Sequence, residues 1–231
     1  MTLPFGVFSK NQIDRLGDRL RRSAIEDADL KLLDAYRRSF VPGYEKVIAT
    51  IREVIAYHPT GRPAKSTTSI VEKLKRESIR LTQMQDIAGC RLVVRLIGTQ
   101  NTVVRRLKNK LNAVVVDRRK QPSHGYRAVH VIATADLKPI EIQVRTTLQH
   151  LWAEYSEKLA DVIDPAIKYG GGPAAVRDIL DRFSDTVAQV EALELQKGTP
   201  EQRRQIRNVK QQLRRLLKSA TVDVANLFRG K

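Results

Sequence analysis

Apolar residues recur at intervals of three and four in the first part of the chain, a pattern typical of amphipathic helices. A helix is predicted to begin after Ser9, which has the residue pattern of a capping box. A second helix follows the break at 41–43 and ends before Pro59. Hydroxyl residues at 66–69 are suited to cap a third helix. Residues 1–43 are interpreted as an N-terminal helical extension.

The middle of the chain changes to an alternation of apolar and polar residues, which is the period of a β-strand. Strands are predicted over four segments: 91–97, 113–117, 129–133 and 140–145. A helix with apolar residues between 103 and 111 separates the first two. In the last segment, three side chains are expected to share the polar face of the strand: Glu141, Gln143 and Arg145.

Helical spacing returns after the last strand, where Thr147 is placed to open a helix. Segment 164–173, which contains three consecutive glycines, is interpreted as a hinge or loop. Two further helices follow, the second opened by a threonine–proline pair. This order predicts an α+β (α/β) fold: a mixed sheet of about five strands flanked by helices, with N-terminal helices and a C-terminal helical pair. The expected central domain covers 44–163, and the helical pair covers 174–231.

Composition limits the class of protein. A chain of 231 residues, 42% of them hydrophobic, can bury one sizeable core. The single cysteine, Cys90, lies in an apolar run and is interpreted as a buried small hydrophobe rather than a reactive thiol. The start of the chain lacks a signal-peptide pattern, and no run reaches the roughly 18 apolar residues that a membrane span needs. We therefore expect a cytoplasmic protein with no membrane partner.

The net charge of +17 is too large for ordinary surface solvation and indicates a polyanionic partner. Residues 51–130 carry 17 Lys and Arg against 5 Asp and Glu, and residues 200–231 carry 9 against 2. The second block alone is consistent with a solvated helix face. The first block contains strand-like segments and a loop with glycine and proline, for which we favour phosphate binding.

The common phosphate-binding motifs are absent: there is no G-x-x-x-x-G-K-[ST], no G-x-G-x-x-G and no protein-kinase motif set. Four other segments stand out, in this order: Lys65 to Arg76, Asp86-Ile87-Ala88-Gly89-Cys90-Arg91, Gly125-Tyr126-Arg127-Ala128-Val129-His130 and Glu141-Ile142-Gln143-Val144-Arg145-Thr146. Together they resemble the synthetase domain of the RelA/SpoT family, whose members carry K-S-x-x-S-I-x-x-K-L-x-R, D-I-x-G-x-R, G-Y-R-S-x-H and E-x-Q-[IV]-R-T. The resemblance spans residues 44–160.

This resemblance implies an enzyme, a pyrophosphokinase of the GTP pyrophosphokinase type. Such an enzyme moves the β,γ-pyrophosphate of ATP to a ribose 3′-hydroxyl with the help of Mg²⁺. The family comparison places the catalytic and metal-binding carboxylates at Asp86 and Glu141. The expected ATP-binding residues are Lys65, Lys73, Arg76, Arg91 and Arg62, the last of which is shifted by one position from the family pattern. The expected acceptor-binding residues are Tyr126, stacking on the base, with His130, Gln143 and Arg145.

Each of these residues has a plain structural interpretation when it is taken alone. Asp86 could cap a helix, Glu141 could pair with Arg145 on an exposed strand, and Tyr126 could be a half-buried core ring. The occurrence of the motifs together and in order favours the functional interpretation. The chain also departs from the family pattern, because Ala128 replaces a serine.

The sequence leaves the acceptor open. A small alarmone synthetase would use GDP or GTP, whereas a toxin-type member would use the 3′ end of tRNA and could have an antitoxin protein as its partner. Basic residues of the last helix would extend a tRNA-binding surface, so tRNA is slightly favoured; among them are Arg207, Arg214 and Arg215. An adenosine nucleotide also remains open. A catalytically inactive RNA-binding module fits the charge but leaves Asp86 and Glu141 unexplained.

Overall fold

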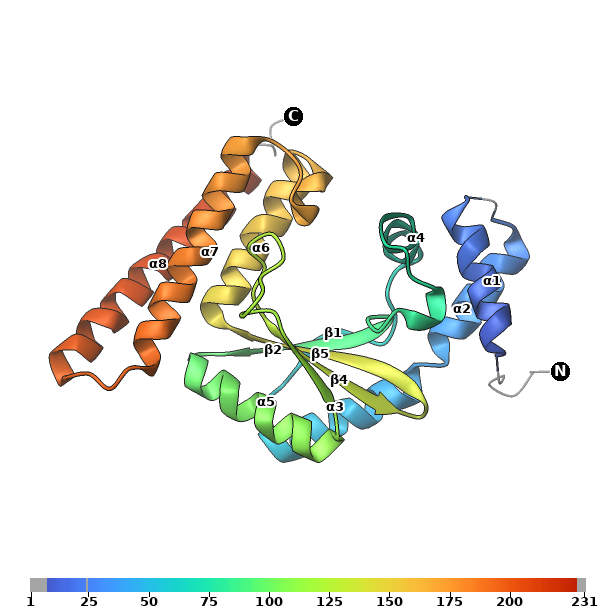
Figure 1. Cartoon of the computed structure of the whole chain (residues 1–231), viewed down its shortest axis with the longest axis horizontal. Coiled ribbons are helices and arrows are strands. Elements are labelled where there is room, and N and C mark those ends of the chain that lie inside the picture. The colour runs from blue at the N-terminus through green and yellow to red at the C-terminus, as the bar shows by residue number, and fades with distance from the viewer. Residues whose placement is uncertain (1–7, 24, 228–231) are drawn as a thin grey trace. The chain divides into compact units, whose positions relative to one another are not determined.

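This computed structural model describes residues 8–23 and 25–227, and Figure 1 labels its helices and strands. Within these residues, five strands hydrogen-bond in the order β1-β2-β5-β4-β3. Their bounds are β1 Thr60–Arg62, β2 Ala88–Val94, β3 Val114–Asp117, β4 Val129–Ala135 and β5 Lys138–Thr146. The predicted α+β fold with a mixed five-stranded sheet is confirmed. The outermost residues of the expected extension and helical pair lie outside the described residues.

The described chain falls into two compact units, the first of which contains most of the N-terminal part. It comprises residues up to Leu92, with Arg106–Val114 and Val131–Gln143. Its helices are α1 (Lys10–Arg21), α2 (Asp27–Arg38), α3 (Val41–Ile55), α4 (Thr67–Arg76) and a short 3-10 helix, η1 (Leu81–Gln83). Large side chains buried here include Leu16, Leu33, Ile51 and Ile70 of these helices and Phe40 between α2 and α3.

Local hydrogen bonds explain where the helices of this unit begin. Ser9 and Ser66 cap α1 and α4 as predicted, since each hydroxyl accepts from the backbone N–H three residues later, at 3.1 and 3.3 Å. The pattern analysis did not predict α2. Its N-terminus is a capping box formed by Glu26 and Asp29, so the hydroxyl residue that usually marks a helix start is missing.

Strand β2 lies three residues earlier than predicted, over Ala88–Val94 rather than 91–97. Alternate residues along it are buried, but Leu96 lies beyond its end and is 48% exposed. The alanine, glycine and cysteine of its first half carry a weak strand signal, and α5 (Ile97–Leu111) begins soon after its last residue. The sequence therefore correctly predicted a strand here, but the predicted bounds of the strand were wrong.

A two-residue turn joins β4 to β5. Asp136 and Leu137 both have left-handed backbones, with φ of 48° and 61°, which is the requirement of a type I′ turn. Such a turn matches the twist of an antiparallel pair and fixes its register. It thereby determines which side chains of β5 face the same way.

The second unit comprises Val93–Arg105, Val115–His130 and the chain from Val144 onward. Its helices are α6 (Thr147–Val162), the 3-10 helix η2 (Pro165–Tyr169), α7 (Ala174–Leu195) and α8 (Pro200–Leu227). Helix α6 begins at Thr147 as predicted, and the three glycines lie in the loop after η2. Figure 1 shows α6, α7 and α8 packed side by side. No helix in the described ranges is both long and apolar enough to cross a membrane.

One apolar core is shared by α6, α7 and α8. Trp152 of α6 is 4% exposed and its indole N–H donates to the carbonyl oxygen of Leu180 in α7 at 2.8 Å. Leu213 and Leu217 of α8 are buried in the same cluster. The interpretation of Trp152 as a core residue is therefore confirmed.

Candidate active site

A half-buried carboxylate, Asp86, lies between two lysines in the first unit. Lys65 Nζ is 2.5 Å from Asp86 Oδ2, and Lys73 Nζ is 2.9 Å from Asp86 Oδ1. The three side chains are between 13% and 21% exposed. Burial alone would raise the pKa of Asp86, but the two ammonium groups outweigh it and hold the pKa below its usual value. Asp86 is therefore ionised at neutral pH.

The elements around this cluster explain its geometry. Lys65 follows β1, and its backbone N–H donates to the carbonyl oxygen of Ile87 at 2.6 Å. Lys73 lies on α4, one face of which is buried through Ile70 and Leu74. Two ammonium groups share one carboxylate, so the cluster retains an excess positive charge in a partly dry environment. Such a cluster is suited to bind phosphate oxygens.

The second predicted carboxylate, Glu141, lies on β5 and is linked to Gln143. Gln143 Nε2 donates to Glu141 Oε2 at 2.8 Å, which confirms that the two side chains share one face of the strand. Gly89 of β2 lies next to Glu141: a Cβ atom added at Gly89 would be only 2.6 Å from the Glu141 carbonyl oxygen. Asp86 lies two residues before β2 and Glu141 lies in the neighbouring strand β5, and both residues belong to the first unit.

We expect Gly89→Ala to lower the free energy of unfolding by about 2 kcal/mol, because its methyl group overlaps backbone atoms that cannot move aside. Gly98→Ala is the matched control. Gly98 is in α5 and an added Cβ meets nothing within 4 Å, so the control should be neutral or stabilising. Urea denaturation of both variants measures the difference. Equal stabilities would show that β2 can move away from Glu141.

The three predicted ATP-binding arginines lie on elements that adjoin this cluster. Arg62, in β1, is exposed and is opposite Gly89 in the antiparallel pairing of β1 with β2. Arg91, in β2, is opposite Thr60. Arg76 is the last residue of α4, and it donates to Glu77 Oε1 at 2.9 Å.

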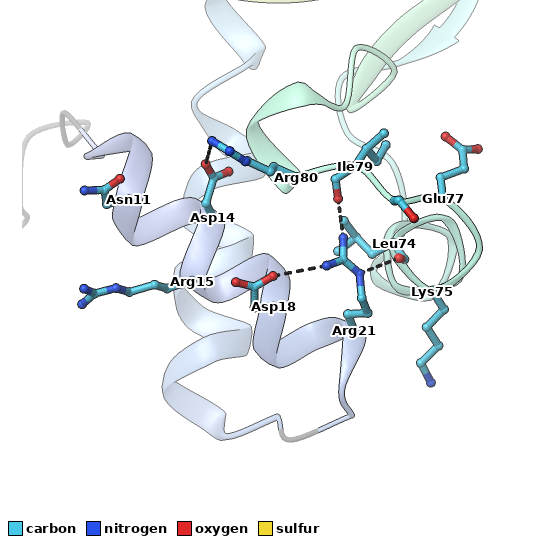
Figure 2. Close-up of a pocket in the computed structure, with 11 residues that line it drawn as sticks. Asn11, Asp14, Arg15, Asp18, Arg21, Leu74, Lys75, Glu77, Ile79 and Arg80 are labelled. Atoms are coloured by element: carbon cyan, nitrogen blue, oxygen red, sulfur yellow. Dashed lines mark hydrogen bonds and ion pairs between the residues drawn. The ribbon is translucent and has the colours of Figure 1, made fainter.

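Sequence reasoning missed Arg21, which fixes the C-terminal end of α4 (Figure 2). Its Nε donates to the carbonyl oxygen of Leu74 at 2.8 Å, and its guanidinium also donates to the carbonyl oxygen of Ile79 and to Asp18. These groups line a polar pocket of about 600 Å³ between α1 and the segment that follows α4. Because α4 carries Lys73, Arg21 contributes to placing that lysine. No local pattern in the sequence marks this arginine.

The predicted acceptor-binding residues Tyr126, His130 and Arg145 gather in the second unit. The Tyr126 hydroxyl is 3.0 Å from His130 Nε2, and Arg145 Nη2 donates to the same hydroxyl at 3.0 Å. The Arg145 guanidinium also lies 5.0 Å from the centre of the Tyr126 ring, in cation–π distance. Arg145 is 3% exposed, although its place in the strand alternation predicted a polar face. The aromatic ring is thus held by two side chains.

The predicted RNA-binding residues lie on the exposed side of α8. Arg207, Arg214 and Arg215 are all exposed. Arg207 and Arg214 are seven residues apart, which places them on the same face of the helix. Leu213 and Leu217 of the same helix are buried in the core shared with α6 and α7. The three arginines therefore lie on the part of α8 that remains exposed.

Asp86 and Glu141 offer the hard oxygen ligands that Mg²⁺ prefers. In the described parts of the chain, no three His, Cys, Asp or Glu side chains gather in a way that could hold a metal by themselves. Mg²⁺ often binds through one or two carboxylates and completes its coordination with substrate phosphates and water. The donor set fits an ion that arrives with a nucleotide triphosphate.

Comparison with known proteins identifies the family of this chain. The family described as "Region found in RelA / SpoT proteins" matches residues 61–160. A GTP pyrophosphokinase of Bacillus subtilis, YjbM, is 31% identical over 148 residues, which are 57% of this chain and 67% of that protein. An uncharacterised protein of Mycobacterium tuberculosis is 35% identical over 141 residues, and the match covers 55% of this chain. This chain spans about half, 52%, of the length of that relative.

Solved structures show the same fold. The crystal structure of small alarmone synthetase 1 from Bacillus subtilis matches with a TM-score of 0.54 and 26% identity, covering 72% of this chain and 94% of that one. A GTP pyrophosphokinase family protein from Streptococcus pneumoniae matches with a TM-score of 0.56 and 20% identity, covering 86% of this chain and 98% of that one. The second likeness concerns the fold alone.

Proposed function

The chain belongs to the RelA/SpoT family, and from this premise we propose that it transfers the β,γ-pyrophosphate of ATP to a ribose 3′-hydroxyl. The observation that carries the proposal is the cluster of Lys65, Lys73 and Asp86 beside the strand that bears Glu141. In the reaction the ribose oxygen forms a bond to the β-phosphorus. The bond from that phosphorus to the oxygen bridging to the α-phosphorus breaks, and AMP leaves.

The two lysines have the role of neutralising the triphosphate. In the structure both ammonium groups contact Asp86, and phosphate oxygens would offer them alternative acceptors at similar distances. If the two ammonium groups bound phosphate oxygens instead, the oxygens of Asp86 would become available. Asp86 and Glu141 would then hold Mg²⁺. The ion supplies charge stabilisation on the phosphate oxygens when it is bound.

Glu141 is also suited to accept the proton of the attacking hydroxyl. It is partly exposed on β5, and Gln143 donates to one of its oxygens, which orients the carboxylate. A carboxylate in hydrogen-bond reach of a hydroxyl acts as a general base.

The acceptor that we propose is a guanosine nucleotide, GDP or GTP, giving (p)ppGpp. Support comes from the relatives, since YjbM is named a GTP pyrophosphokinase. The Tyr126 ring, held by Arg145 and His130, would stack on the base. A free nucleotide needs only a local site of this kind and few charges beyond those already described.

The 3′ end of tRNA is the second candidate, and the basic face of α8 favours it. A tRNA would need an extended cationic surface in addition to the Tyr126 ring. A toxin-type role with an antitoxin partner rests on the same candidate and stays a prediction from the family resemblance.

Ionic strength and the basic face separate the two acceptors. If tRNA is the acceptor, its use should fall steeply with salt, and charge reversal of Arg207, Arg214 and Arg215 should weaken binding by about 1–3 kcal/mol. Use of GDP or GTP should barely change, because those nucleotides do not reach α8. The measurement is transfer from ATP labelled at the γ-phosphate, with Mg²⁺, to GDP, GTP, ATP or total tRNA at two salt concentrations.

Circular dichroism of the triple variant checks that the helix is intact. Unchanged labelling of tRNA by the variant would remove α8 from the mechanism. If the unaltered protein labels none of the acceptors, the proposed activity is contradicted. The chain would then be interpreted as a catalytically inactive RNA-binding module.

A further inference from the structure

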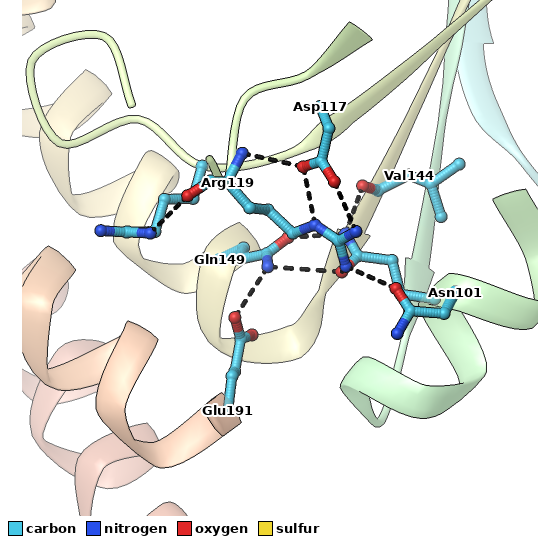
Figure 3. A network of polar contacts seen from close by, with 8 residues as sticks. Asn101, Asp117, Arg119, Val144, Gln149 and Glu191 are labelled. Atoms are coloured by element: carbon cyan, nitrogen blue, oxygen red, sulfur yellow. Dashed lines mark hydrogen bonds and ion pairs between the residues drawn. The ribbon is translucent and has the colours of Figure 1, made fainter. Parts of the chain in front are cut away.

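A buried carboxylate on α7 binds the end of the strand that carries Arg145 (Figure 3). Glu191 is 5% exposed. One of its oxygens accepts from the hydroxyl of Thr146, and the other accepts from Gln149 Nε2 at 2.8 Å. Thr146 and Gln149 form the capping box of α6. Helix α7 is thus joined by side-chain hydrogen bonds to the junction of β5 and α6.

The hydrogen bonds continue from Gln149 to the start of α5 and the loop after β3. Gln100 Nε2 donates to Gln149 Oε1 at 2.8 Å and to the carbonyl oxygen of Val144 at 2.7 Å. Arg119 Nη1 donates to Gln100 Oε1 at 3.0 Å. Arg119 is held in turn by Asp117 through contacts of 2.8 and 2.7 Å. Gln100 and Gln149 are at most 1% exposed, so water cannot replace these partners.

The hydrogen bonds of this side-chain network are donated from Arg119 to Gln100, from Gln100 to Gln149 and from Gln149 to Glu191. An arginine side chain has donors only, so Arg119 requires the oxygen of Gln100 on its side. The nitrogen of Gln100 must then face Gln149, and the nitrogen of Gln149 must face residue 191. Only an acceptor fits there. Burial outweighs the hydrogen bonds from Thr146 and Gln149, so the pKa of Glu191 lies above its usual value; in either protonation state Glu191 keeps an oxygen that can accept from Gln149.

We propose that Glu191 is a positioning residue for the acceptor site, an inference that rests on the function proposed above. Its network holds the carbonyl oxygen of the residue before Arg145 and the hydroxyl of the residue after it. The backbone of Arg145 is therefore fixed from both sides, and its guanidinium holds Tyr126 by a 3.0 Å hydrogen bond and by ring contact. Glu191 lies outside residues 61–160, the stretch that the family shares.

Because the hydrogen bonds have a fixed direction, the positioning role can be tested by exchanging the residues at positions 149 and 191. In Glu191→Gln, one of the two oxygens that accept from Thr146 and Gln149 becomes an amide nitrogen, which cannot accept a hydrogen bond. Gln149→Glu places two carboxylates side by side. The double exchange, Gln149→Glu with Glu191→Gln, restores a donor at 191 facing an acceptor at 149 and leaves an oxygen at 191 for Thr146.

The readout is steady-state transfer from labelled ATP, with KM measured separately for GDP and for ATP. We expect Glu191→Gln to raise the KM for GDP about tenfold and to leave the KM for ATP within about twofold, because the network contacts only the acceptor side. The double exchange should return the KM for GDP to within about threefold of the unaltered protein. The control is Glu201→Gln, the same chemical change at an exposed position of α8, which should alter neither constant.

The outcomes separate the inference from the function on which it rests. No transfer by the unaltered protein would contradict the proposed function itself. Transfer with an unchanged KM for GDP in Glu191→Gln would overturn the positioning role alone. If either single variant fails to fold, the double exchange decides: it must fold and recover the KM for GDP. A double exchange that is no more stable than the single variants, or that folds with a raised KM, would also overturn the inference.

Discussion

Asp86→Asn and Glu141→Gln should each reduce pyrophosphate transfer on the order of 10³-fold, since each removes a negative charge that would hold Mg²⁺ or take up the hydroxyl proton. In Asp86→Asn, the two lysines also lose their shared counter-ion. The measurement is kcat/KM for labelled ATP with each acceptor, at saturating Mg²⁺.

The matched control for these substitutions is Asp136→Asn, at the turn between β4 and β5. Asp136 pairs with Lys46 at the surface, and asparagine tolerates the left-handed backbone of the turn. Its transfer rate should equal that of the unaltered protein. Near-normal turnover by well-folded Asp86→Asn or Glu141→Gln would remove that carboxylate from the active site.

Lys210→Met should lower the free energy of unfolding by about 3–5 kcal/mol, because it leaves a buried glutamate without its counter-charge. Lys210 Nζ lies 2.5 Å from Glu194 Oε1 and 2.6 Å from the carbonyl oxygen of Arg95. The two charged side chains are only 11% and 9% exposed. The pair therefore fastens α8 to α7 and to the segment before α5.

Replacing both charged residues shows whether the loss of stability comes from an unpaired charge or from lost packing. The double variant Lys210→Met with Glu194→Met removes the unpaired charge, so it should be more stable than Lys210→Met alone by at least about 1 kcal/mol. Lys108→Met, at an exposed position of α5, is the control and should change stability by less than about 0.5 kcal/mol. Urea denaturation measures all three. A loss below about 1 kcal/mol in Lys210→Met would show that the ion pair contributes little.

Most of the sheet could be predicted from the sequence, because its signals are local; the two candidate carboxylates were chosen by the family resemblance, and their roles stay predictions. The alternation around Glu141 and Gln143 predicted a shared strand face, and the 2.8 Å hydrogen bond between them confirms it. The motif beginning at Asp86 predicted a carboxylate near a strand. The structure places it just before β2, between two lysines.

The long-range contacts could not be predicted. Arg21 reaches the end of α4 across more than fifty positions of sequence, and no period or cap refers to such a contact. Glu191 follows Val187 by four residues on the apolar side of α7, so a polar residue interrupts an apolar stripe there. That interruption was the available signal for a buried polar network. Its partners, Thr146 and Gln149, lie 45 and 42 positions away and could be known only from the fold.

The core that α6 shares with α7 and α8 limits how chimeras with other members of the family can be made. Residues 61–160 match the family, yet Trp152 and Leu159 within this stretch are covered by Leu180, Leu213 and Leu217 from beyond it. In a chimera joined near residue 160, α6 would come from one protein and α7 and α8 from another, so the side chains of this core would no longer be complementary. Exchanging α6, α7 and α8 as one block, together with the N-cap residue Thr146, would keep the complementary surfaces together and would carry Glu191 along with Thr146 and Gln149.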